Sequence, residues 1–522
     1  MSVTSKSWSI ALEGLGGHSV EVETHVTSGL PRFALIGLPD ASLGEAGDRI
    51  RAALDSVGCR LPPERVTTNM LPASLRKHGS GFDMAIAASI LGATRMIDPA
   101  APGRNMHIGE LSLTGEVRSV RGVLPAVLAA RNAGFETALV PAESEAEARL
   151  VEGIRIVPVA SVYELAVHYG ADPLSLIEPP PNVRSPLATA VSRRDRATSD
   201  LQDVLGQEEA VRALLVTAAG GHHLFMQGPP GSGKTMLAER LPGILPDLDS
   251  SRAIEVAALR SLRGLNVPGE LSLRPPFQAP HHTASAVALI GGGSGVIQPG
   301  ALSLASHGVL FLDEAPEFPR HVLDSLRQPL ESGEITIHRA RSSASFPARA
   351  QLVLAANPCP CGNAGAADLA CECTPSTQRR YLARLSGPLL DRVDVQLRVE
   401  KAGIAALRLQ ADGAVGSLTT AVAAAQVREA RERARRRFGR MSFDRNADLT
   451  SAALRAPELR PEPGAADLLD RALVRGQISM RGYSRIQRVA WTIADLEGKD
   501  RPTSAHVAEA LYYRVRDAQK VA

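Results

Sequence analysis

A short glycine-rich segment carries the clearest chemistry in the sequence. It follows an apolar run at residues 224–227, opens a predicted helix, and consists of Gly228, Pro229, Pro230, Gly231, Ser232, Gly233, Lys234 and Thr235. Glycines let successive backbone N–H groups point at phosphate oxygens, and the helix N-terminus adds its positive dipole end. We therefore predict a phosphate-binding loop, or P-loop, with Lys234 on the β- and γ-phosphates of ATP and Thr235 as a ligand of Mg²⁺.

Two acidic residues at the end of a second apolar run supply the groups that a P-loop needs. Residues 309–312 are typical of a buried parallel strand, and Asp313 and Glu314 follow them directly. In doubly wound sheets the ligand lies at the carboxyl ends of the strands, so both carboxylates should face the nucleotide. We expect Asp313 to hold Mg²⁺ through water and Glu314 to orient the hydrolytic water.

Polar residues beside two further strands extend this site. Asn357 ends the run QLVLAAN, where it suits a sensor of the γ-phosphate. Arg392 precedes the strand VDVQLRV, where a subunit boundary could carry it into a neighbour's nucleotide, and Arg384 is the alternative. Arginine stabilises transition-state charge with a planar, permanently charged fork.

Four of the five cysteines cluster directly after Asn357. The pairs are Cys359 with Cys361 and Cys371 with Cys373, and nine residues separate the two pairs. Four thiolates suffice for a tetrahedral zinc site, although structural sites usually have two residues between paired cysteines. Free thiols and a redox pair therefore remain the alternatives. Five cysteines in 522 residues are too few for a disulfide framework, which favours a reducing compartment.

The elements that position these residues form about three domains, as expected for 522 residues. A proline-rich stretch at 172–200 is predicted to be a linker. It separates an α/β domain at 1–171 from a second α/β domain at 201–400, and a helical domain follows at 401–522. No apolar run approaches the length that spans a bilayer, so we predict a cytoplasmic protein without a membrane segment. The net charge of +3 is small, so any contact with nucleic acid must be a local patch.

The motifs of the middle third resemble the magnesium-chelatase-like AAA+ ATPases of the ComM/YifB type. They are GPPGSGKTMLAERLPGILP, APHHTASAVALIGGGSGVIQPG, LESGEITIHRA, LAANPCPCG and SGPLLDRVD. The resemblance implies an AAA+ P-loop αβα domain with an insertion before the second acid strand and a β-hairpin before the sensor strand. It also implies a homo-oligomeric ring, expected to be a hexamer, and, for ComM, ATP-driven branch migration of DNA in recombination and natural transformation.

The C-terminal part resembles the helical lid of the same family through SMRGYSRIQRVAWTIADLEG. This likeness puts Arg481 at the position of a second sensor arginine for the γ-phosphate, with Arg485 as the fallback. An arginine-rich run at 428–440 is either a solvated helix face or a patch for nucleic acid.

Two segments of the central domain are candidates for DNA contact. Residues 279–306 contain His281, His282 and a glycine run, and we expect them to lie outside the core and to project into a ring pore. Residues 334–349 read as a hairpin whose Arg339, Arg341 and Arg349 are available for phosphates, or are simply solvated. Contacts to backbone phosphates need charge without sequence reading, which suits a translocating motor.

The N-terminal domain resembles the Lon-protease C-terminal fold, which is ribosomal S5 domain 2-like. The resemblance rests on GSGFDMAIAASIL and IGELSLTGEVRSVRGVLPAVLAARNAG, and it puts Gly81 where Lon has its nucleophilic serine and Leu124 where Lon has its lysine. Ser80 is adjacent, but no lysine lies between Lys77 and Lys234. We therefore expect a non-peptidase scaffold, for DNA binding or for ring assembly.

Three classes of function fit these observations. The first is an ATP-hydrolysing motor that remodels forked or four-way DNA, with ATP and Mg²⁺ as cofactors. The second is a chelatase-type motor that inserts Mg²⁺ into a porphyrin, and the third is a protein-remodelling or Lon-like proteolytic machine. The basic hairpin, the cysteine cluster and the Lon-like domain favour the first class.

Overall fold

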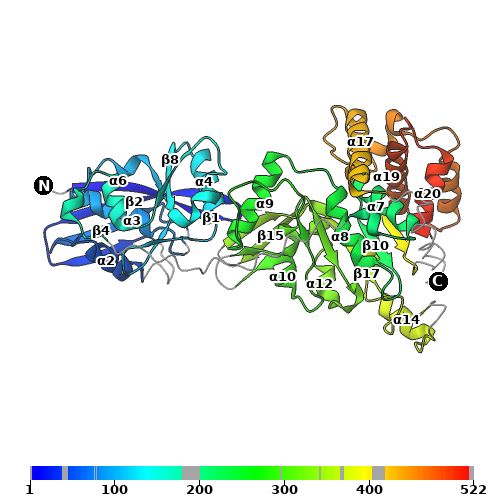
Figure 1. Ribbon diagram of the computed structural model, residues 1–522, viewed down its shortest axis with the longest axis horizontal. Coiled ribbons are helices and arrows are strands. Elements are labelled where there is room, and N and C mark those ends of the chain that lie inside the picture. Colours follow the sequence, from blue (N-terminus) through cyan, green and yellow to red (C-terminus); the bar gives the residue numbers. More distant parts are fainter. Residues whose placement is uncertain are drawn as a thin grey trace.

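The chain forms three consecutive parts that lie in a row (Figure 1). The computed structural model describes residues 3–37, 45–75, 77, 79–178, 200–293, 297–339, 342–364, 370–401 and 418–515. An α/β part is N-terminal, a second α/β part is central, and the described C-terminal elements are all helices. The predicted α/β chain with a parallel sheet of the P-loop type is therefore confirmed. The Lon-like and lid assignments and the domain boundaries stay predictions.

The N-terminal part is built on a seven-stranded mixed sheet of order β3-β4-β2-β1-β5-β8-β9. Its long strands β1 and β2 pair in antiparallel fashion, with Trp8 opposite Glu21. Alternating side chains of β2 are buried, which is the pattern of a sheet covered on one face. The strands are β1 (Val3–Glu13), β2 (Gly16–Thr27), β3 (Arg32–Ile36), β4 (Arg65–Leu71), β5 (Met106–His107), β8 (Thr137–Pro141) and β9 (Arg155–Val159), and a small hairpin adds β6 (Glu110–Leu111) and β7 (Val117–Arg118).

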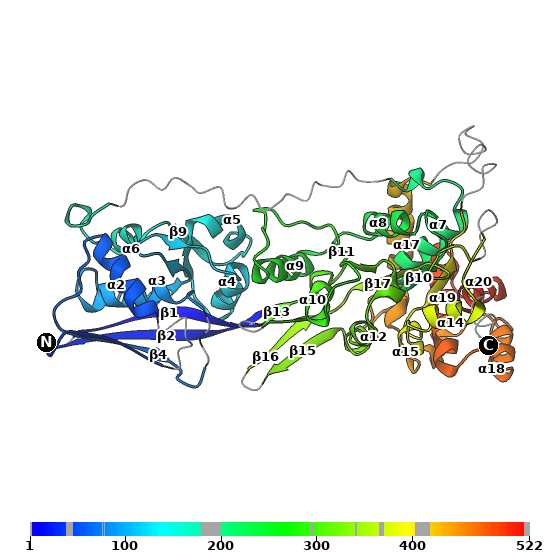
Figure 2. The ribbon, with the colours of Figure 1, turned by 90° about the horizontal axis from the view of Figure 1, so that it is seen from below.

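Helices cover one face of this sheet (Figure 2). Every residue of α3 (Asp83–Ala93) is buried, because the helix lies between the sheet and a second layer of helices. The other helices are α2 (Ala46–Ser56), α4 (Val123–Asn132), α5 (Glu145–Ala148) and α6 (Val162–His168). Residues of the expected linker that the structure describes still contact this part, since the backbone N–H of Ile177 donates to the carbonyl of Val57.

The central part holds a five-stranded parallel sheet of order β11-β14-β17-β10-β18. Leu224 lies beside Val353 on one side and Val395 on the other. The strands are nearly continuous apolar runs because both faces of the sheet are covered. They are β11 (Phe277–Gln278), β14 (Val309–Leu312), β17 (Gln351–Ala356), β10 (Leu224–Gln227) and β18 (Val395–Arg398).

Side-chain alternation divides these strands between two cores. Leu224 and Met226 face one core, together with residues of the P-loop helix and of the C-terminal helices. Phe225 and Leu310 face the other core, which is formed with short helices of the central part. The helices of this part are α7 (Glu208–Gly220), α8 (Lys234–Ile244), α9 (Ser250–Leu262), α10 (Ala286–Ile290), α11 (Ala301–Leu304), α12 (Arg320–Asp324), α13 (Pro329–Ser332), α14 (Pro375–Leu382) and α15 (Gly387–Leu390).

The expected insertion and hairpin are both present. The insertion contains α10, α11 and the two-residue strands β12 (Gly291–Gly292) and β13 (Gln298–Pro299), and the hairpin is β15 (Glu334–Arg339) with β16 (Ser342–Pro347). The expectation that the insertion lies outside the core is wrong in part. Leu289 and Leu302 are completely buried in the second core, because α10 and α11 fold back against the sheet. Within the insertion, only the short segments outside these two buried helices can project from the core.

The C-terminal helices pack against the central sheet on the side of α7 and α8. They are α17 (Thr420–Phe438), α18 (Asp467–Val474), α19 (Met480–Leu496) and α20 (Ser504–Val515). The apolar side chains of α17 and α19 join the core of the central part, so these two parts share one hydrophobic core. Among the described helices, none combines the length and the apolar character that crossing a bilayer requires.

The N-terminal part docks on α9 and on the hairpin (Figure 2). Ser261 of α9 accepts a backbone hydrogen bond from Gly122 at 3.1 Å through its carbonyl oxygen. At the hairpin, a Cβ on Gly14 would lie 2.6 Å from the carbonyl oxygen of Ser345, and Gly14 has a φ of +62°. Only glycine fits this close, left-handed turn, so the turn between β1 and β2 contacts the hairpin directly.

Candidate functional site

The P-loop lies between β10 and α8 and has the backbone that phosphate binding requires. Gly231 and Gly233 have φ values of +74° and +86°, which side chains with a Cβ rarely adopt. A Cβ on Gly228 would lie 2.1 Å from the carbonyl oxygen of Val399 at the end of β18, so this glycine lets the two strands stay together. The loop is fixed by its neighbours and leads directly into the N-terminus of α8.

Lys234 is held inside this loop by neutral acceptors. Its Nζ donates to the carbonyl oxygens of Gly228 at 2.7 Å and Pro229 at 2.9 Å, and to Oδ1 of Asn357 at 3.3 Å. Burial lowers the pKa of Lys234, and the charges of Asp313 and Glu314 oppose this shift. Within the described part of the chain, no carboxylate forms an ion pair with Lys234, so its charge is available for phosphate oxygens.

Asp313 and Glu314 lie at the carboxyl end of β14, facing α8. The hydroxyl of Thr235 donates to Oδ2 of Asp313 at 2.8 Å, so the two expected Mg²⁺ ligands already lie together. Glu314 has a left-handed backbone, with φ of 49° and ψ of 43°, and its N–H donates to Oδ1 of Asp313 at 2.9 Å. A non-glycine residue with these backbone torsions is strained, and strained residues of this kind occur preferentially at functional sites.

The residues at this edge of the sheet fit ATP with Mg²⁺. Three successive carboxyl ends supply Gly228, Asp313 and Asn357, and hydroxyl and carboxylate oxygens are ligands that Mg²⁺ prefers. The buried hydroxyl of Ser232 has no hydrogen-bond partner among the residues that the structure describes. The arrangement can bind a triphosphate and present a carboxylate to water, although the individual roles stay predictions.

A cavity of about 640 Å³, lined by arginines, lies at the opposite edge of the sheet. His223, Gly308, Gln351 and Asp394 line it, and each stands at the amino end of a strand. Five acidic residues only partly balance eight arginines, which are Arg252, Arg349, Arg392, Arg431, Arg435, Arg445, Arg485 and Arg488. The structure therefore has a second charged site, and it faces away from the P-loop of the same chain.

The predicted finger and sensor arginines lie at this amino edge. Arg392 is nearly buried, donates to the carbonyl oxygen of Pro388 at 2.6 Å and pairs with Glu331. Its buried Nε has no hydrogen-bond partner within the described part of the chain. Arg481 lines a smaller adjoining cavity together with Arg392, is exposed, and forms no ion pair with the described residues. Both arginines therefore lie at the edge of the sheet opposite to Lys234, and their roles stay predictions.

The two alternative arginines are already engaged. Arg485 donates to Oδ1 of Asp394 at 2.6 Å and to the carbonyl oxygen of Arg392, which fixes it as a strut between α19 and the strand β18. Arg384 pairs with Glu317 at 3.1 Å and remains half exposed. Of the two, Arg384 is freer to reach another molecule.

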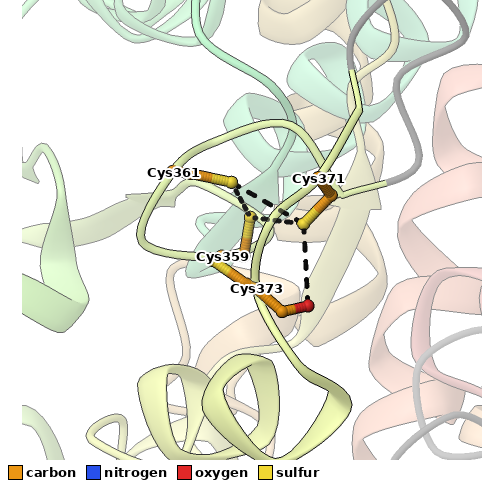
Figure 3. A group of neighbouring side chains, drawn as sticks. All are labelled: Cys359, Cys361, Cys371 and Cys373. Atoms are coloured by element: carbon orange, nitrogen blue, oxygen red, sulfur yellow. Dashed lines mark hydrogen bonds between the residues drawn. The ribbon is translucent and has the colours of Figure 1, made fainter.

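The four clustered cysteines face one another beside the P-loop (Figure 3). All four ligand atoms lie within 4.8 Å of one another, and Sγ of Cys359 lies 3.3 Å from Cys361 and 3.6 Å from Cys371. Zn–S bonds of about 2.3 Å place tetrahedral sulfurs about 3.8 Å apart, so the spacing suits a four-thiolate metal site. A backbone N–H of Asn363 and the neighbouring thiol of Cys359 lower the pKa of Cys361 to about 6. Burial and the neighbouring thiols raise the pKa of Cys371 and raise that of Cys373 to about 11, so a thiolate, the form that metals bind, is favoured at Cys361 and not at these two.

The cysteine loop connects the P-loop with α14. A Cβ on Gly362 would lie 2.6 Å from Cγ of Pro230, so the loop rests on the P-loop itself. Gln378 of α14 donates to Sγ of Cys371 at 3.5 Å and to the carbonyl oxygen of Cys373 at 3.2 Å. A displacement of this loop would therefore alter the packing of both the P-loop and α14. The fifth cysteine, Cys59, is buried as expected, and burial raises its pKa to about 11.

The candidate DNA contacts differ in their surroundings. Arg349 is exposed and lines the arginine-rich cavity. Arg339 is half buried and has a partner, and Arg341 lies outside the described residues. The hairpin is covered on one side, because Ala344 and Phe346 are buried against Leu12 and Leu259. Only part of the hairpin is thus free for another molecule.

The arginine-rich run forms the end of α17 and the turn after it, and is less exposed than its composition suggests. Arg431 donates to the carbonyl oxygen of Ala218 at 2.6 Å, and burial lowers its pKa to about 9. Arg437 pairs with the buried Asp495 and stacks 4.0 Å from the ring of Trp491. Together with Arg433, which donates to the carbonyl oxygen of Asp495 at 2.6 Å, these arginines hold the helices together, whereas four other basic side chains of the run are exposed, namely Arg428, Arg435, Arg436 and Arg440.

The sequence reasoning missed a buried polar network that joins the lid helices to the sheet. His222 contacts Oδ2 of Asp394 at 3.1 Å and the hydroxyl of Thr492 at 2.8 Å. Its members come from three distant segments, so no local spacing signals them. A second missed contact links His282 of the insertion with Glu314, whose Oε2 lies 3.4 Å from Nδ1.

The N-terminal part contains no serine and lysine pair among the side chains described there. Ser80 donates its hydroxyl to Glu110, whereas Lys77 is buried and donates to the carbonyl oxygen of Pro72 at 2.5 Å. Gly81 and Leu124 bring no reactive group, and Leu124 is completely buried. The hypothesis of a non-peptidase scaffold stays a prediction.

The fold and the carboxyl-edge site define a P-loop nucleoside triphosphatase. Three family models match the chain: "Magnesium chelatase, subunit ChlI" at residues 200–407, "Subunit ChlI of Mg-chelatase" at 22–144, and "Magnesium chelatase, subunit ChlI C-terminal" at 417–514. The chain therefore belongs to the magnesium-chelatase-like AAA+ ATPases of the ComM/YifB type. This agrees with the predicted resemblance.

Full-length relatives support the same assignment. The chain is 45% identical over 517 residues to uncharacterized protein Rv2897c of Mycobacterium tuberculosis, with 99% of each chain covered. It is 41% identical over 526 residues to competence protein ComM of Haemophilus influenzae, with 98% of each covered. It is 38% identical over 508 residues to uncharacterized protein YifB of Escherichia coli, covering 97% of this chain and 96% of the relative. The similarity thus includes all three parts.

Proposed function

We propose that this protein is an ATP-hydrolysing ring motor that acts on DNA, with branch migration in recombination or natural transformation as its task. The observation that carries the proposal is the pair of charged sites at opposite edges of the central sheet. One edge gathers Lys234, Asp313 and Asn357, and the other gathers arginines. A nucleotide held by one subunit would face the arginines of the next in a ring. Its similarity to a competence protein supports DNA as the substrate.

The carboxyl-edge residues would perform hydrolysis. Lys234 and the P-loop N–H groups bind the β- and γ-phosphates, and Thr235 and Asp313 hold Mg²⁺. Bound Mg²⁺ would neutralise charge that develops on the phosphate oxygens. Glu314 orients the attacking water, and Asn357, which contacts Lys234, senses the γ-phosphate.

The amino-edge arginines would complete the site of the neighbouring subunit. Arg481 is exposed and needs no rearrangement to reach another molecule. Arg392 first has to leave Glu331, which makes its engagement dependent on assembly. We take a homohexamer as the working arrangement, and Arg384 as the finger if Arg392 proves dispensable.

Forked or four-way DNA tests the proposed substrate. We expect such DNA to stimulate ATP hydrolysis by the wild-type protein and to be unwound or migrated in the presence of ATP. Glu314→Gln should bind ATP and DNA but leave the DNA unmoved, because the water lacks its orienting carboxylate. Failure of both stimulation and movement would favour the chelatase or protein-remodelling alternatives.

We also propose that the cysteine cluster binds a structural zinc ion. The donor set is four sulfurs within mutual reach, and Cys359 is buried while Cys361 is exposed. Zinc would brace the loop that rests on Pro230 and thereby the P-loop. Protein purified without chelator should contain one zinc per chain, and Cys359→Ser together with Cys371→Ser should lose it. If wild-type protein purified without chelator contains no zinc and has four freely titratable thiols in the cluster, this proposal is contradicted. Cys59→Ser, whose thiol lies far from the cluster in sequence, is the matched control and should keep the zinc.

A further inference from the structure

The insertion brings a histidine against the glutamate that is proposed to activate water. Nδ1 of His282 lies 3.4 Å from Oε2 of Glu314. The other carboxylate oxygen, Oε1, has no partner among the residues that the structure describes. The backbone N–H of Glu314 is bound to Asp313, and the carboxylate itself contacts His282.

The course of the chain explains why the histidine lies there. β11 ends at Gln278 and runs parallel to β14, which ends just before Asp313. The segment that leaves β11 therefore emerges beside the acidic pair. It is anchored again three residues after the histidine pair, where Ser285 caps α10 and Leu289 of that helix is buried in the core. The intervening residues have little freedom to move away.

The ring of His282 is also supported from its face. The ring of His281 lies against it, with 4.0 Å between the centroids and an angle of 35°. His281 is in turn fixed by a contact of 2.9 Å between its Nδ1 and the hydroxyl of Thr283. The orientation of the imidazole is therefore set by its own segment, independently of the glutamate.

We infer that His282 is a positioning residue for Glu314, an inference that rests on the proposed hydrolytic role of that glutamate. The imidazole lies at ion-pair distance from the carboxylate, with 3.4 Å between Nδ1 and Oε2, and this contact leaves Oε1 free to accept a hydrogen bond from the attacking water. Lys234 and the P-loop bind the nucleotide without contacting His282. The histidine should therefore affect the rate of hydrolysis and not the binding of ATP.

A set of matched variants tests this inference through steady-state hydrolysis and through binding of a fluorescent ATP analogue. His282→Ala should lower kcat about 10-fold to 100-fold, the range expected for a misplaced catalytic group, with the KM and the analogue affinity within about twofold of wild type. His282→Asn, which keeps a donor near the same place, should recover part of kcat. His321→Ala changes an exposed histidine on α12 and should behave as wild type.

A double variant separates positioning from a merely structural effect. If His282 acts through Glu314, adding His282→Ala to Glu314→Asp should slow hydrolysis no further than about twofold, because the two side chains act as one unit. Losses that multiply would overturn the inference, and so would a wild-type kcat in His282→Ala or a loss confined to KM. If His282→Ala fails to fold, the same comparison of single and double variants is made with His282→Asn and Glu314→Asp.

The inference and the proposed function can fail separately. Full hydrolysis by Glu314→Gln would overturn both the inference and the proposed role of Glu314 in orienting water, whereas failure of DNA to stimulate hydrolysis or to be moved would overturn the proposed function alone. An inactive Glu314→Gln beside a fully active His282→Ala would overturn only the role of the histidine.

Discussion

The two edges of the central sheet use charge in different ways. At the carboxyl edge the described partners of Lys234 are neutral oxygens, and the pair of Thr235 and Asp313 remains accessible. At the amino edge most arginines already have protein partners, such as Asp394 for Arg485 and Glu331 for Arg392. The first edge is prepared to receive a ligand, whereas the second resembles an interface whose charges are partly satisfied in the single chain.

This difference suggests which edge depends on assembly. A site with an uncompensated lysine can bind phosphate in one subunit alone. An arginine that is held by its own chain contributes only after a neighbour offers a better partner. Variants at the two edges should therefore differ in whether they impair binding, turnover or stability.

Lys234→Ala should have the largest effect. It removes the only charge that the P-loop itself offers to the phosphates, and each lost electrostatic contact of this kind costs about 100-fold to 1,000-fold. We expect ATP binding to be lost and kcat/KM to fall by more than about 1,000-fold. Calorimetric binding of ATP and phosphate release measure the two effects. Lys401→Ala changes an exposed lysine shortly after β18 and is the control. Retained ATP affinity in Lys234→Ala would contradict the P-loop assignment.

Arg392→Ala should impair turnover and leave ATP binding intact. An arginine finger contributes about 1,000-fold or more to hydrolysis, because it stabilises charge only in the transition state. Mixing Lys234→Ala and Arg392→Ala subunits should restore activity above that of either protein alone. At some interfaces the intact P-loop of an Arg392→Ala subunit then faces the intact Arg392 of a Lys234→Ala subunit. A mixture no more active than its components would show that both residues serve the same subunit. Arg320→Ala, in an exposed position on α12, is the control.

Asp394→Ala should destabilise the contact between lid and sheet. The substitution leaves Arg485 and His222 without their buried partner, and losing one member of a buried pair costs about 3 to 5 kcal/mol. Thermal unfolding should therefore begin at a lower temperature than in wild type. Asp391→Ala removes an exposed carboxylate close by and should change little.

The pH dependence of the same variant gives a second test. Burial alone would raise the pKa of Asp394, but the hydrogen bond with His222 and the charge of Arg485 outweigh it and lower this pKa below its usual range. The carboxylate thus stabilises the folded state fully above about pH 4, and this stabilisation is lost as the pH falls through the lowered pKa. The difference between wild type and Asp394→Ala should be constant near neutral pH and narrow in acid. A difference that grows in acid would contradict the ion pair.

The sequence predicted the carboxyl edge better than the amino edge for a physical reason. Asp313 follows β14 directly and Thr235 follows β10 through the short P-loop, so the carboxyl ends of the parallel strands bring the two side chains together. Asp394, His222 and Thr492 meet only because the lid packs on the sheet, and their spacing carries no signal. For the same reason Arg431 and Arg437 looked like surface charges in the sequence although they are internal supports.

Arg349→Ala should have the smallest effect and tests whether the amino edge also meets DNA. Arg349 is exposed at the mouth of the arginine-rich cavity, next to the end of the hairpin. If it contacts one backbone phosphate, its loss should weaken DNA binding only a few-fold, equally for all sequences, and should reduce the slope of log affinity against log salt by about 1. Fluorescence anisotropy with forked DNA at several salt concentrations measures this slope, and Arg320→Ala is again the control. An unchanged slope with reduced ATP turnover would assign Arg349 to the neighbour's nucleotide, which would make the amino edge a subunit contact and leave DNA binding to other residues.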